Sequence, residues 1–335
     1  MALQFILGNS GSGKTYYIHQ KIVELSNQDP KKNFLIIVPE QFTMQTQREL
    51  VDMQMHHSIM NIDILSFKRL AYRVFDELGS FCYQVLEETG KNLILRRIAQ
   101  EKADELTVLK KNMTKMGYID EVKSLISELA QYNIMPMQLA EAAERLPEGS
   151  FSYKLKDVLT MYQGFLDFLE GRFVTAEEVL ELLIDVADQS EILRNSVIVF
   201  DGFTGFTPIQ NRLINELLKT AEDIYVTVTI DVRENFYHCM GAHELFAMSK
   251  KMIRSLQKMA DELHIPVTDP IVLAHHKNSR FKQSEALFFL EQNLFRSRGD
   301  QYDLKEGQTD ISIYSLKNPR EELQYIAREI ERLVR

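Results

Sequence analysis

Residues 3–15 read Leu-Gln-Phe-Ile-Leu-Gly-Asn-Ser-Gly-Ser-Gly-Lys-Thr, an apolar run followed by a glycine-rich stretch, a lysine and a threonine. The apolar run has the length and composition of a buried strand, and the rest fits the pattern GxxxxGK[ST] of phosphate-binding loops. In such loops the glycines let successive backbone N–H groups point at phosphate oxygens, and the helix that follows adds the positive end of its dipole. We therefore predict a strand, a phosphate-binding loop and a helix over residues 14–25.

This loop predicts a nucleotide site that takes ATP and Mg²⁺. Lys14 is expected to reach the β- and γ-phosphates, and the Thr15 hydroxyl is expected to ligate the metal ion. The predicted nucleotide-binding residues of the loop are Gly8, Asn9, Ser10, Gly11, Ser12, Gly13, Lys14 and Thr15.

A second acidic position supports the same site. Residues 197–201 read Val-Ile-Val-Phe-Asp, a strand that ends in a carboxylate, and P-loop enzymes hold Mg²⁺ with such an aspartate. Asp201 is therefore a predicted Mg²⁺ residue together with Thr15, although an aspartate before glycine also suits an ordinary turn at a strand end. Gly202 stands where an ATPase is expected to carry a glutamate that activates water, so no catalytic base is predicted.

Composition narrows the class of protein. The 335 residues are 45% hydrophobic and 26% charged, which is typical of a globular protein with about two domains. The two cysteines, Cys82 and Cys239, lie far apart, and the histidine pairs at 56–57 and 275–276 lack metal-site spacing. No apolar run is long enough to span a bilayer and no leader precedes the loop, so a cytoplasmic protein without a membrane segment is expected. The net charge of −9 does not rule out a local nucleic-acid track.

The order of the predicted elements indicates an α/β protein whose parallel sheet is interrupted by helices. Strands are predicted at residues 3–7, 34–38, 61–66, 196–200, 223–230 and 310–316, with an extended segment near 270–274. Helices without a strand are predicted between residues 87 and 193, at 92–111, 119–132, 153–169 and 179–187, the last with a capping box from Thr175 to Glu178. The predicted domains are a discontinuous P-loop domain at residues 1–86 and 194–318, a helical insertion at 87–193, and a helix at 319–335 that leads to a further part of a longer protein.

Five segments carry a resemblance to a known family, at residues 5–15, 35–50, 64–79, 197–214 and 314–330. In this order they resemble the first RecA-like domain of UvrD-like superfamily 1 helicases, split by a helical insertion. More specifically, they are similar to the AddB (RexB) subunits of the bacterial AddAB (RexAB) helicase–nucleases, and the resemblance covers the whole chain.

The resemblance implies a subunit that has lost motor activity, processes DNA ends for recombinational repair and takes part in recognising the Chi sequence. Its partners would be DNA and an AddA (RexA) subunit that drives translocation. A second helicase-like domain and a nuclease domain with an iron–sulfur cluster would follow in the longer protein. Neither Cys82 nor Cys239 matches the cysteines of that cluster.

Three features agree with a degenerate motor. Gly202 replaces the expected glutamate, the first strand leaves no room for an upstream adenine-recognition glutamine, and arginine fingers of a second RecA-like domain are outside this sequence. A missing base costs roughly 10²–10⁴-fold in rate, and a missing arginine finger costs roughly 10³–10⁵-fold. ATP binding without useful turnover is expected.

The resemblance also implies a path for DNA over the loops after the second and third strands. The matching residues are Gln41, Phe42, Phe67, Lys68, Arg69 and Arg73, with the phenylalanines expected to stack on bases and the cations to meet phosphates. Alternatively, Phe67 belongs to the buried stripe of a helix, and Lys68 and Arg69 lie on its solvated face. Gln210 matches a glutamine near the γ-phosphate, but packing or capping of the helix that begins at Thr207 and Pro208 explains it equally well.

Two other functions stay open at this stage. An active DNA-dependent ATPase would need another carboxylate, such as Glu40, as its base. A small-molecule kinase also begins at a P-loop, but the long helical insertion and the lack of an arginine-rich lid disfavour it.

Overall fold

The structure, a computed structural model, describes residues 2–54, 58–79, 84–113, 115–274, 280–296, 300–303 and 310–335. Two compact units make up the chain: residues 1–9 and 13–274 form the first, and residues 10–12 and 275–335 form the second. None of the helices in these described ranges has both the length and the apolar character needed to cross a membrane.

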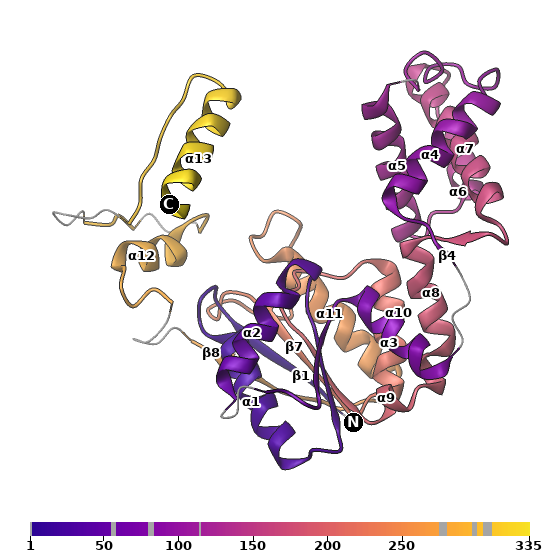
Figure 1. The fold of residues 1–335 in the computed structure, drawn as a ribbon. Helices are drawn as coiled ribbons and strands as arrows, with labels where there is room; N and C mark the ends of the chain where they lie inside the picture. The colour runs from indigo at the N-terminus through magenta and orange to yellow at the C-terminus, as the bar shows by residue number, and fades with distance from the viewer. Residues whose placement is uncertain are drawn as a thin grey trace. The chain divides into compact units, whose positions relative to one another are not determined.

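The first unit is built on a six-stranded sheet in which every pairing is parallel (Figure 1). The strand order is β3-β2-β6-β7-β1-β8. Most of these strands are almost continuously apolar because helices cover both faces of the sheet. The strands are β1 (Leu3–Gly8), β2 (Asn33–Ile37), β3 (Ile62–Leu65), β6 (Ser196–Phe200), β7 (Asp223–Thr229) and β8 (Val267–Leu273).

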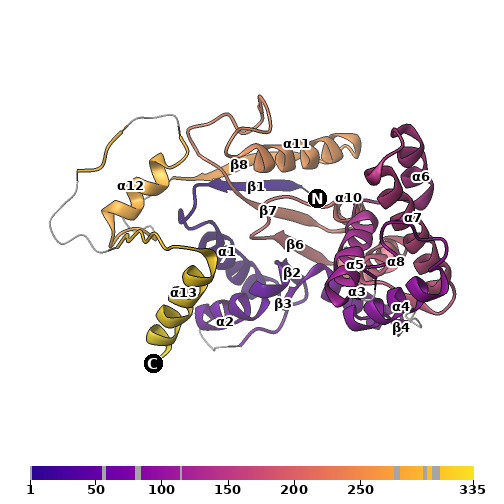
Figure 2. The ribbon, with the colours of Figure 1, turned by 90° about the horizontal axis from the view of Figure 1, so that it is seen from above.

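Helices α1 (Lys14–Gln28) and α2 (Thr43–Met53) cover one face of the sheet (Figure 2). Ile18 and Ile22 of α1 lie one turn apart and pack with Ile6 and Ile36 of the strands in one buried cluster. This spacing places a single apolar stripe of α1 on the sheet. Consequently, the start of α1 is fixed beside the end of β1.

The opposite face carries a larger core under several helices (Figures 1 and 2). Leu70 and Val74 of one helix, Leu213 and Leu217 of another, and Ile253 of a third are completely buried there. The helices are α3 (Phe67–Leu78), α8 (Ala176–Val186), the short α9 (Glu191–Arg194), α10 (Pro208–Thr220) and α11 (Ala247–Glu262). The predicted α/β fold with a parallel sheet is confirmed.

A helical segment with a core of its own interrupts the sheet between β3 and β6. Its buried cluster runs from Leu86 to Leu169 and shares no residue with the two clusters of the sheet. The helices are α4 (Glu88–Glu101), α5 (Met116–Gln131), α6 (Pro136–Arg145) and α7 (Ser150–Leu169). The domain boundaries predicted at residues 86, 193 and 318 stay a prediction. The two compact units divide the chain at other positions, after residue 274 and at residues 10–12.

Three predictions for individual elements are wrong. The helix expected at 92–111 spans Glu88–Glu101, because the N–H groups of Thr107, Val108 and Leu109 bond to Asp157 instead of to a further helical turn. A strand does occur in the helical region: β5 (Phe173–Val174) pairs with β4 (Gln84–Val85), and two residues are too short to give a periodic signal. Residues 310–316 form no strand, because no strand of the described chain pairs with them.

The capping box predicted from Thr175 to Glu178 is confirmed. Thr175 accepts the N–H of Glu178 at 3.3 Å, and the Glu178 carboxylate accepts the N–H of Thr175 at 2.6 Å. In this way the first turn of α8 satisfies two of its N–H groups that lack helical partners. Thr207 and Gln210 form the same arrangement at the start of α10, where Pro208 is the first helical residue.

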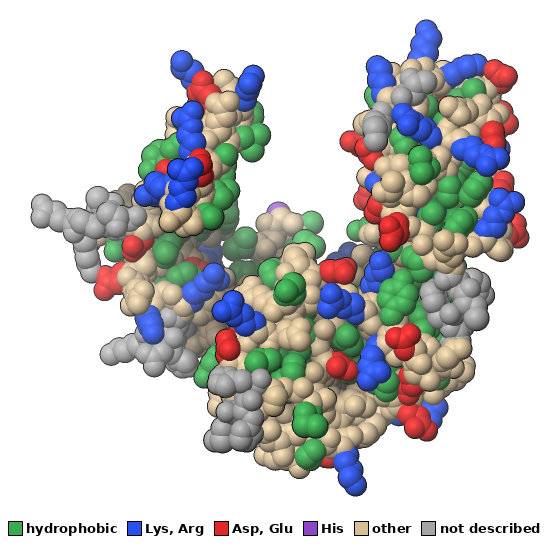
Figure 3. Space-filling view, in the orientation of Figure 1, with side chains coloured by type: hydrophobic (Ala, Val, Ile, Leu, Met, Phe, Trp, Pro, Cys, Tyr) green, Lys and Arg blue, Asp and Glu red, His purple; other side chains and the backbone are tan. Residues whose placement is uncertain are grey.

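The second unit contains α12 (Glu285–Asn293) and α13 (Pro319–Val334). No residue of α13 is buried, and Leu323, Ile326, Ile330 and Leu333 are each more than half exposed. These side chains recur every three or four residues and therefore share one face of the helix. In Figure 3 hydrophobic side chains are visible on this segment among basic ones, which the sequence of α13 identifies as arginines.

Candidate functional site

Five loops of the first unit meet at one edge of the sheet. Parallel strands all point the same way, so the segments that leave their carboxyl ends lie together, and this edge is the usual place for ligands in α/β proteins. The residues at or just after these strand ends are Gly8, Pro39, Ser66, Asp201 and Asp231. Site residues were predicted in the segments of the first four, but none was predicted in the segment of Asp231.

Lys14 folds back onto the start of its own loop. Its ammonium donates to the carbonyl oxygens of Gly8 and Asn9, both at 2.9 Å, and the residue is 9% exposed. Gly13, directly before α1, has φ +94°, a left-handed conformation that favours glycine. The loop therefore curls tightly and holds a buried positive charge at the start of a helix, which suits a phosphate group.

Thr15 and Asp201 lie side by side at this edge. The Thr15 hydroxyl donates to Asp201 Oδ1 at 3.2 Å, and the Thr227 hydroxyl of β7 donates to the same oxygen. Asp201 is 5% exposed and Thr227 is 3% exposed. The sequence pattern gave no reason to select Thr227, because its role depends on β7 lying between β1 and β6.

The donor set fits Mg²⁺. A hydroxyl and a carboxylate offer the oxygen ligands that this ion prefers, and Mg²⁺ usually keeps several waters and binds substrate phosphates rather than an all-protein cage. The described residues contain no group of three or more histidine, cysteine, aspartate and glutamate side chains suited to a metal. The Ser12 hydroxyl of the loop is buried and, within the described part of the chain, has no hydrogen-bond partner.

The end of β7 anchors the loop. The N–H of Val232 donates to Asn9 Oδ1 at 3.2 Å, and Arg233 pairs with Asp231 through two hydrogen bonds of 2.8 and 2.5 Å. Asn9 and Asp231 are 1% and 2% exposed. A strand was predicted at residues 223–230. The carboxylate of Asp231, directly after that strand, is the sequence signal that could have indicated this anchor, as Asp201 does after its own strand.

His19 is a buried residue of the site that sequence analysis did not single out. It lies one turn after Thr15 on α1, is completely buried, and places Nε2 3.9 Å from Asp201 Oδ2. Neither ring nitrogen has a hydrogen-bond partner among the described residues. Burial lowers the pKa of His19 below its ordinary value, against the opposing effects of the Asp201 and Glu49 carboxylates.

Gly202 has φ +80°, so the residue after Asp201 adopts a left-handed conformation. A side chain at this position would be strained. The backbone is thus poorly suited to a glutamate where a catalytic base was expected. Glu40, the alternative base, is exposed in the short helix Glu40–Phe42 after β2.

Gln210 is engaged in its capping box: its side-chain oxygen accepts the N–H of Thr207 at 2.9 Å. This contact agrees with the capping interpretation of that glutamine. It leaves the predicted contact with a γ-phosphate without support from the geometry.

The predicted DNA-contacting residues fall into two groups. Gln41, Lys68 and Arg69 are exposed, Phe42 is 43% exposed, and the exposed Arg73 pairs with Asp63 at 3.4 Å. Phe67 is 7% exposed and lies in an aromatic cluster, its ring 5.8, 5.4 and 6.2 Å from those of Phe200, Phe203 and Phe206. The burial of Phe67 favours the helix-stripe interpretation of this residue.

Within the second unit, residues 10–12 of the loop contact the segment that begins at Arg280. The N–H of Arg280 donates to the carbonyl oxygen of Gly11 at 3.3 Å, and a β-carbon on Gly11 would lie 2.9 Å from the Phe281 ring. Gly11 also has φ +76°. Glycine is therefore required here by both conformation and space.

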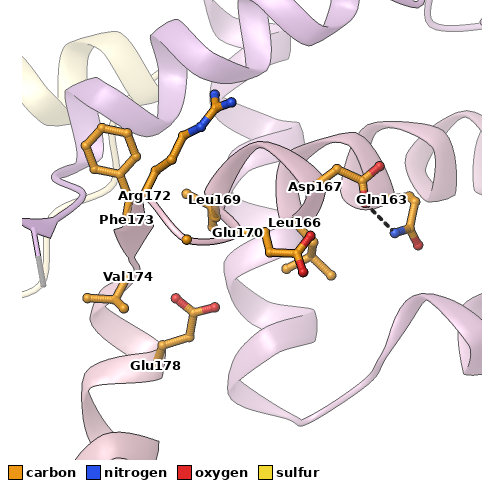
Figure 4. A pocket seen from close by; sticks show the side chains of 10 residues that line it. Gln163, Leu166, Asp167, Leu169, Glu170, Arg172, Phe173, Val174 and Glu178 are labelled. Atoms are coloured by element: carbon orange, nitrogen blue, oxygen red, sulfur yellow. Dashed lines mark hydrogen bonds between the residues drawn. The ribbon is translucent and has the colours of Figure 1, made fainter.

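Among the described residues, cavities away from this edge include two that border the helical segment. The larger, of about 430 Å³, is lined by the end of α7, the turn at Gly171 and the start of α8 (Figure 4). Its charged side chains are mostly acidic, from Asp167, Glu170 and Glu178, which does not suit a phosphate. The smaller, of about 110 Å³, borders Lys91, whose ammonium is already bound by Ser127 and Glu177.

Comparison with known proteins agrees with the predicted resemblance. A family model described as "ADDB, N-terminal" matches residues 5–291. The chain belongs to the AddB N-terminal family.

Its relatives include proteins named as the B component of an ATP-dependent helicase/deoxyribonuclease. That of Lachnoclostridium phytofermentans is 42% identical over 340 residues, and those of Caldanaerobacter subterraneus subsp. tengcongensis and Ruminiclostridium cellulolyticum are each 32% identical. The alignments cover 98–100% of this chain but only 28–29% of the relatives. The chain thus corresponds to the N-terminal part of an AddB protein.

Proposed function

We propose that this AddB region is a RecA-like P-loop domain that binds Mg-ATP and hydrolyses it slowly or not at all. The observation that carries the proposal is the contact of Thr15 with Asp201 beside the buried Lys14, which brings together the three residues that a P-loop site uses. Lys14 would contact the β- and γ-phosphates, and Thr15 and Asp201 would hold Mg²⁺, which neutralises phosphate charge when bound.

The backbone at Gly202 supports slow turnover. A positioned general base contributes roughly 10²–10⁴-fold to a rate, and the left-handed conformation at Gly202 disfavours any residue that could act as one. Glu40 is the alternative base, and its use would make the protein an active DNA-dependent ATPase. Phosphate release distinguishes the two functions.

In the longer protein this region would take part in processing DNA ends, in complex with a helicase–nuclease partner of the AddA (RexA) type and with a role in Chi recognition. The exposed Gln41, Phe42, Lys68, Arg69 and Arg73 lie on loops and a helix that follow neighbouring strands, which supports a track for single-stranded DNA. An iron–sulfur cluster would belong to the part of the longer protein outside this chain. The domain boundaries at residues 86, 193 and 318 belong to the same proposal.

The test is calorimetric titration of Mg-ATP into the wild-type protein and into Lys14→Ala, followed by phosphate release with and without single-stranded DNA. Lys14→Ala is expected to weaken binding at least about 100-fold, since two charge-assisted hydrogen bonds are worth about 3 kcal/mol. Lys21→Ala is the matched control, because it removes a charge from the same helix at a residue that bonds to Gln4 on β1, away from the loop. Its ATP affinity is expected to stay unchanged.

Binding that depends on Lys14, without phosphate release, supports the proposal. DNA-stimulated release would show an active ATPase, and Glu40→Gln would then test the replacement base. If the wild type fails to bind Mg-ATP, the nucleotide-binding proposal is wrong.

A further inference from the structure

His19 is a buried polar side chain at this edge that makes no hydrogen bond to the described residues. It is completely buried, and its two ring nitrogens have no hydrogen-bond partner in the described chain. Buried polar groups in proteins are nearly always bonded, so each exception calls for an explanation. An unbonded buried histidine beside Asp201 points to a hydrogen-bond partner that is present in another state of the site.

The two oxygens of Asp201 have different surroundings. Oδ1 accepts the hydroxyls of Thr15 and Thr227, whereas Oδ2 is the oxygen nearest to His19, at 3.9 Å from Nε2. That distance is about 1 Å longer than a hydrogen bond. A small movement of the carboxylate or of the imidazole would therefore close it.

Thr15 and His19 lie four residues apart on α1, so they share one face of the helix. Both face Asp201, Thr15 toward Oδ1 and His19 toward Oδ2. The same helix thus contacts the two oxygens of the carboxylate at successive turns. Because Ile18 and Ile22 fix α1 on the sheet, the imidazole is held in place by the core.

We propose that His19 is a positioning residue for the metal-binding carboxylate: its Nε2–H donates to Oδ2 of Asp201 and fixes the carboxylate's orientation when Mg-ATP is bound. This inference rests on the proposed Mg-ATP site. Residues that orient a metal ligand from behind are worth 10–100-fold in metal affinity in other proteins. His19 is expected to act on the metal-dependent part of ATP binding alone.

Three variants separate the role of each nitrogen. His19→Gln carries an amide nitrogen near the position of Nε2, His19→Asn carries one near Nδ1 only, and His19→Phe carries none. For each variant, calorimetry gives the ATP affinity with Mg²⁺ and with EDTA, and the ratio of the two is the metal enhancement. Thermal unfolding without nucleotide reports any change in the fold.

His19→Phe and His19→Asn are expected to lower the metal enhancement about tenfold or more, and His19→Gln to keep it within about threefold of wild type. The affinity for ATP in EDTA is expected to be the same in all four proteins. The inference would be overturned if His19→Phe kept the full metal enhancement, or if its ATP affinity fell equally with Mg²⁺ and with EDTA. In either case His19 would be a packing residue.

A wild-type protein that binds ATP equally with and without Mg²⁺ would also overturn it, while the phosphate loop would still stand as a nucleotide site. A wild-type protein that binds no ATP would overturn the proposed function instead. The two failures are therefore distinguishable in the same titrations. If His19→Phe does not fold, the comparison of His19→Asn with His19→Gln decides.

Discussion

The left-handed backbone at Gly202 makes a prediction about stability. Gly202→Ala is expected to cost about 1–2 kcal/mol, because a β-carbon is unfavourable at φ +80°. Its nearest neighbour would be Pro39 Cδ at 3.6 Å, so the cost is conformational and not a clash. Urea denaturation measures it. Gly117→Ala, in the first turn of α5 with open space around it, is the control and is expected to stabilise by about 0.4–1 kcal/mol.

Gly202→Glu extends this prediction to chemistry. It is expected to carry the same strain and to bring no gain in phosphate release, because the left-handed backbone aims a side chain differently from an ordinary strand end. A DNA-stimulated rate above that of the wild type would show that only the missing carboxylate prevents turnover.

His19 predicts a pH dependence of the free energy of unfolding. Its pKa in the folded protein is lowered by burial, against the opposing effects of Asp201, directly after β6, and Glu49 of α2, and the unfolded value is 6.5. Above pH 6.5 His19 is neutral in both the folded and the unfolded state, so its contribution to the free energy of unfolding is constant. Below 6.5 the unfolded state takes up a proton and the folded state does not, so stability is lost as the pH falls.

Urea denaturation between about pH 7.5 and 5.5, without Mg²⁺, measures this loss. His19→Gln is expected to flatten the dependence over that interval. An unchanged slope in the variant would assign the acid sensitivity to other groups.

At the scale of elements, Asp157 of α7 holds the turn that follows α4. Its buried carboxylate accepts the N–H groups of Thr107, Val108 and Leu109 at 2.8–2.9 Å. Asp157→Ala is expected to destabilise the protein by about 3 kcal/mol or more, because three backbone N–H groups, that of Leu109 buried, lose a charged acceptor. Asp167→Ala, at an exposed residue of the same helix, is the control and is expected to stay within about 0.5 kcal/mol.

Proteolysis gives a second readout. In Asp157→Ala the turn at residues 102–113 is expected to become the first site of cleavage. Cleavage that begins elsewhere at the wild-type rate would contradict the role given to Asp157.

The elements that sequence analysis predicted well are those whose signal is local. Strands buried on both faces read as short apolar runs, and the capping box at Thr175 and the N-cap at Thr207 before Pro208 follow a fixed spacing. Residues 310–316 alternate like a strand, but a strand also needs a neighbour, which no local pattern reveals.

The same limit applies to the site. Lys14, Thr15 and Asp201 follow from motifs, whereas Thr227 and His19 depend on which strands become neighbours. The order β6-β7-β1 places Thr227 next to Asp201, and that order is a property of the whole sheet. Spacing in the sequence carries no information about it.

At the scale of the whole molecule, α13 presents an apolar stripe to solvent. The isolated chain is expected to associate at high concentration, because Leu323, Ile326, Ile330 and Leu333 are 51–77% exposed on one helix face. Sedimentation velocity over a range of concentrations measures the association. Leu323→Glu with Ile330→Glu is expected to reduce it strongly, and Arg328→Glu, on the polar face, is the control. Equal association of all three proteins would place the contact elsewhere.

The sheet order also has a consequence for biosynthesis. Leu3 of β1 pairs with Ile224 of β7 and with Val267 of β8, both of which are translated more than 200 residues later. At about 5–20 residues per second, β1 waits roughly 10–45 s on the ribosome for its first neighbour. The helical segment has its own core and can bury its apolar side chains meanwhile. The loop after β1 meets Asp201 only when β7 enters between them, so a nucleotide bound at the proposed site would stabilise the finished sheet and would not guide the early steps of its folding.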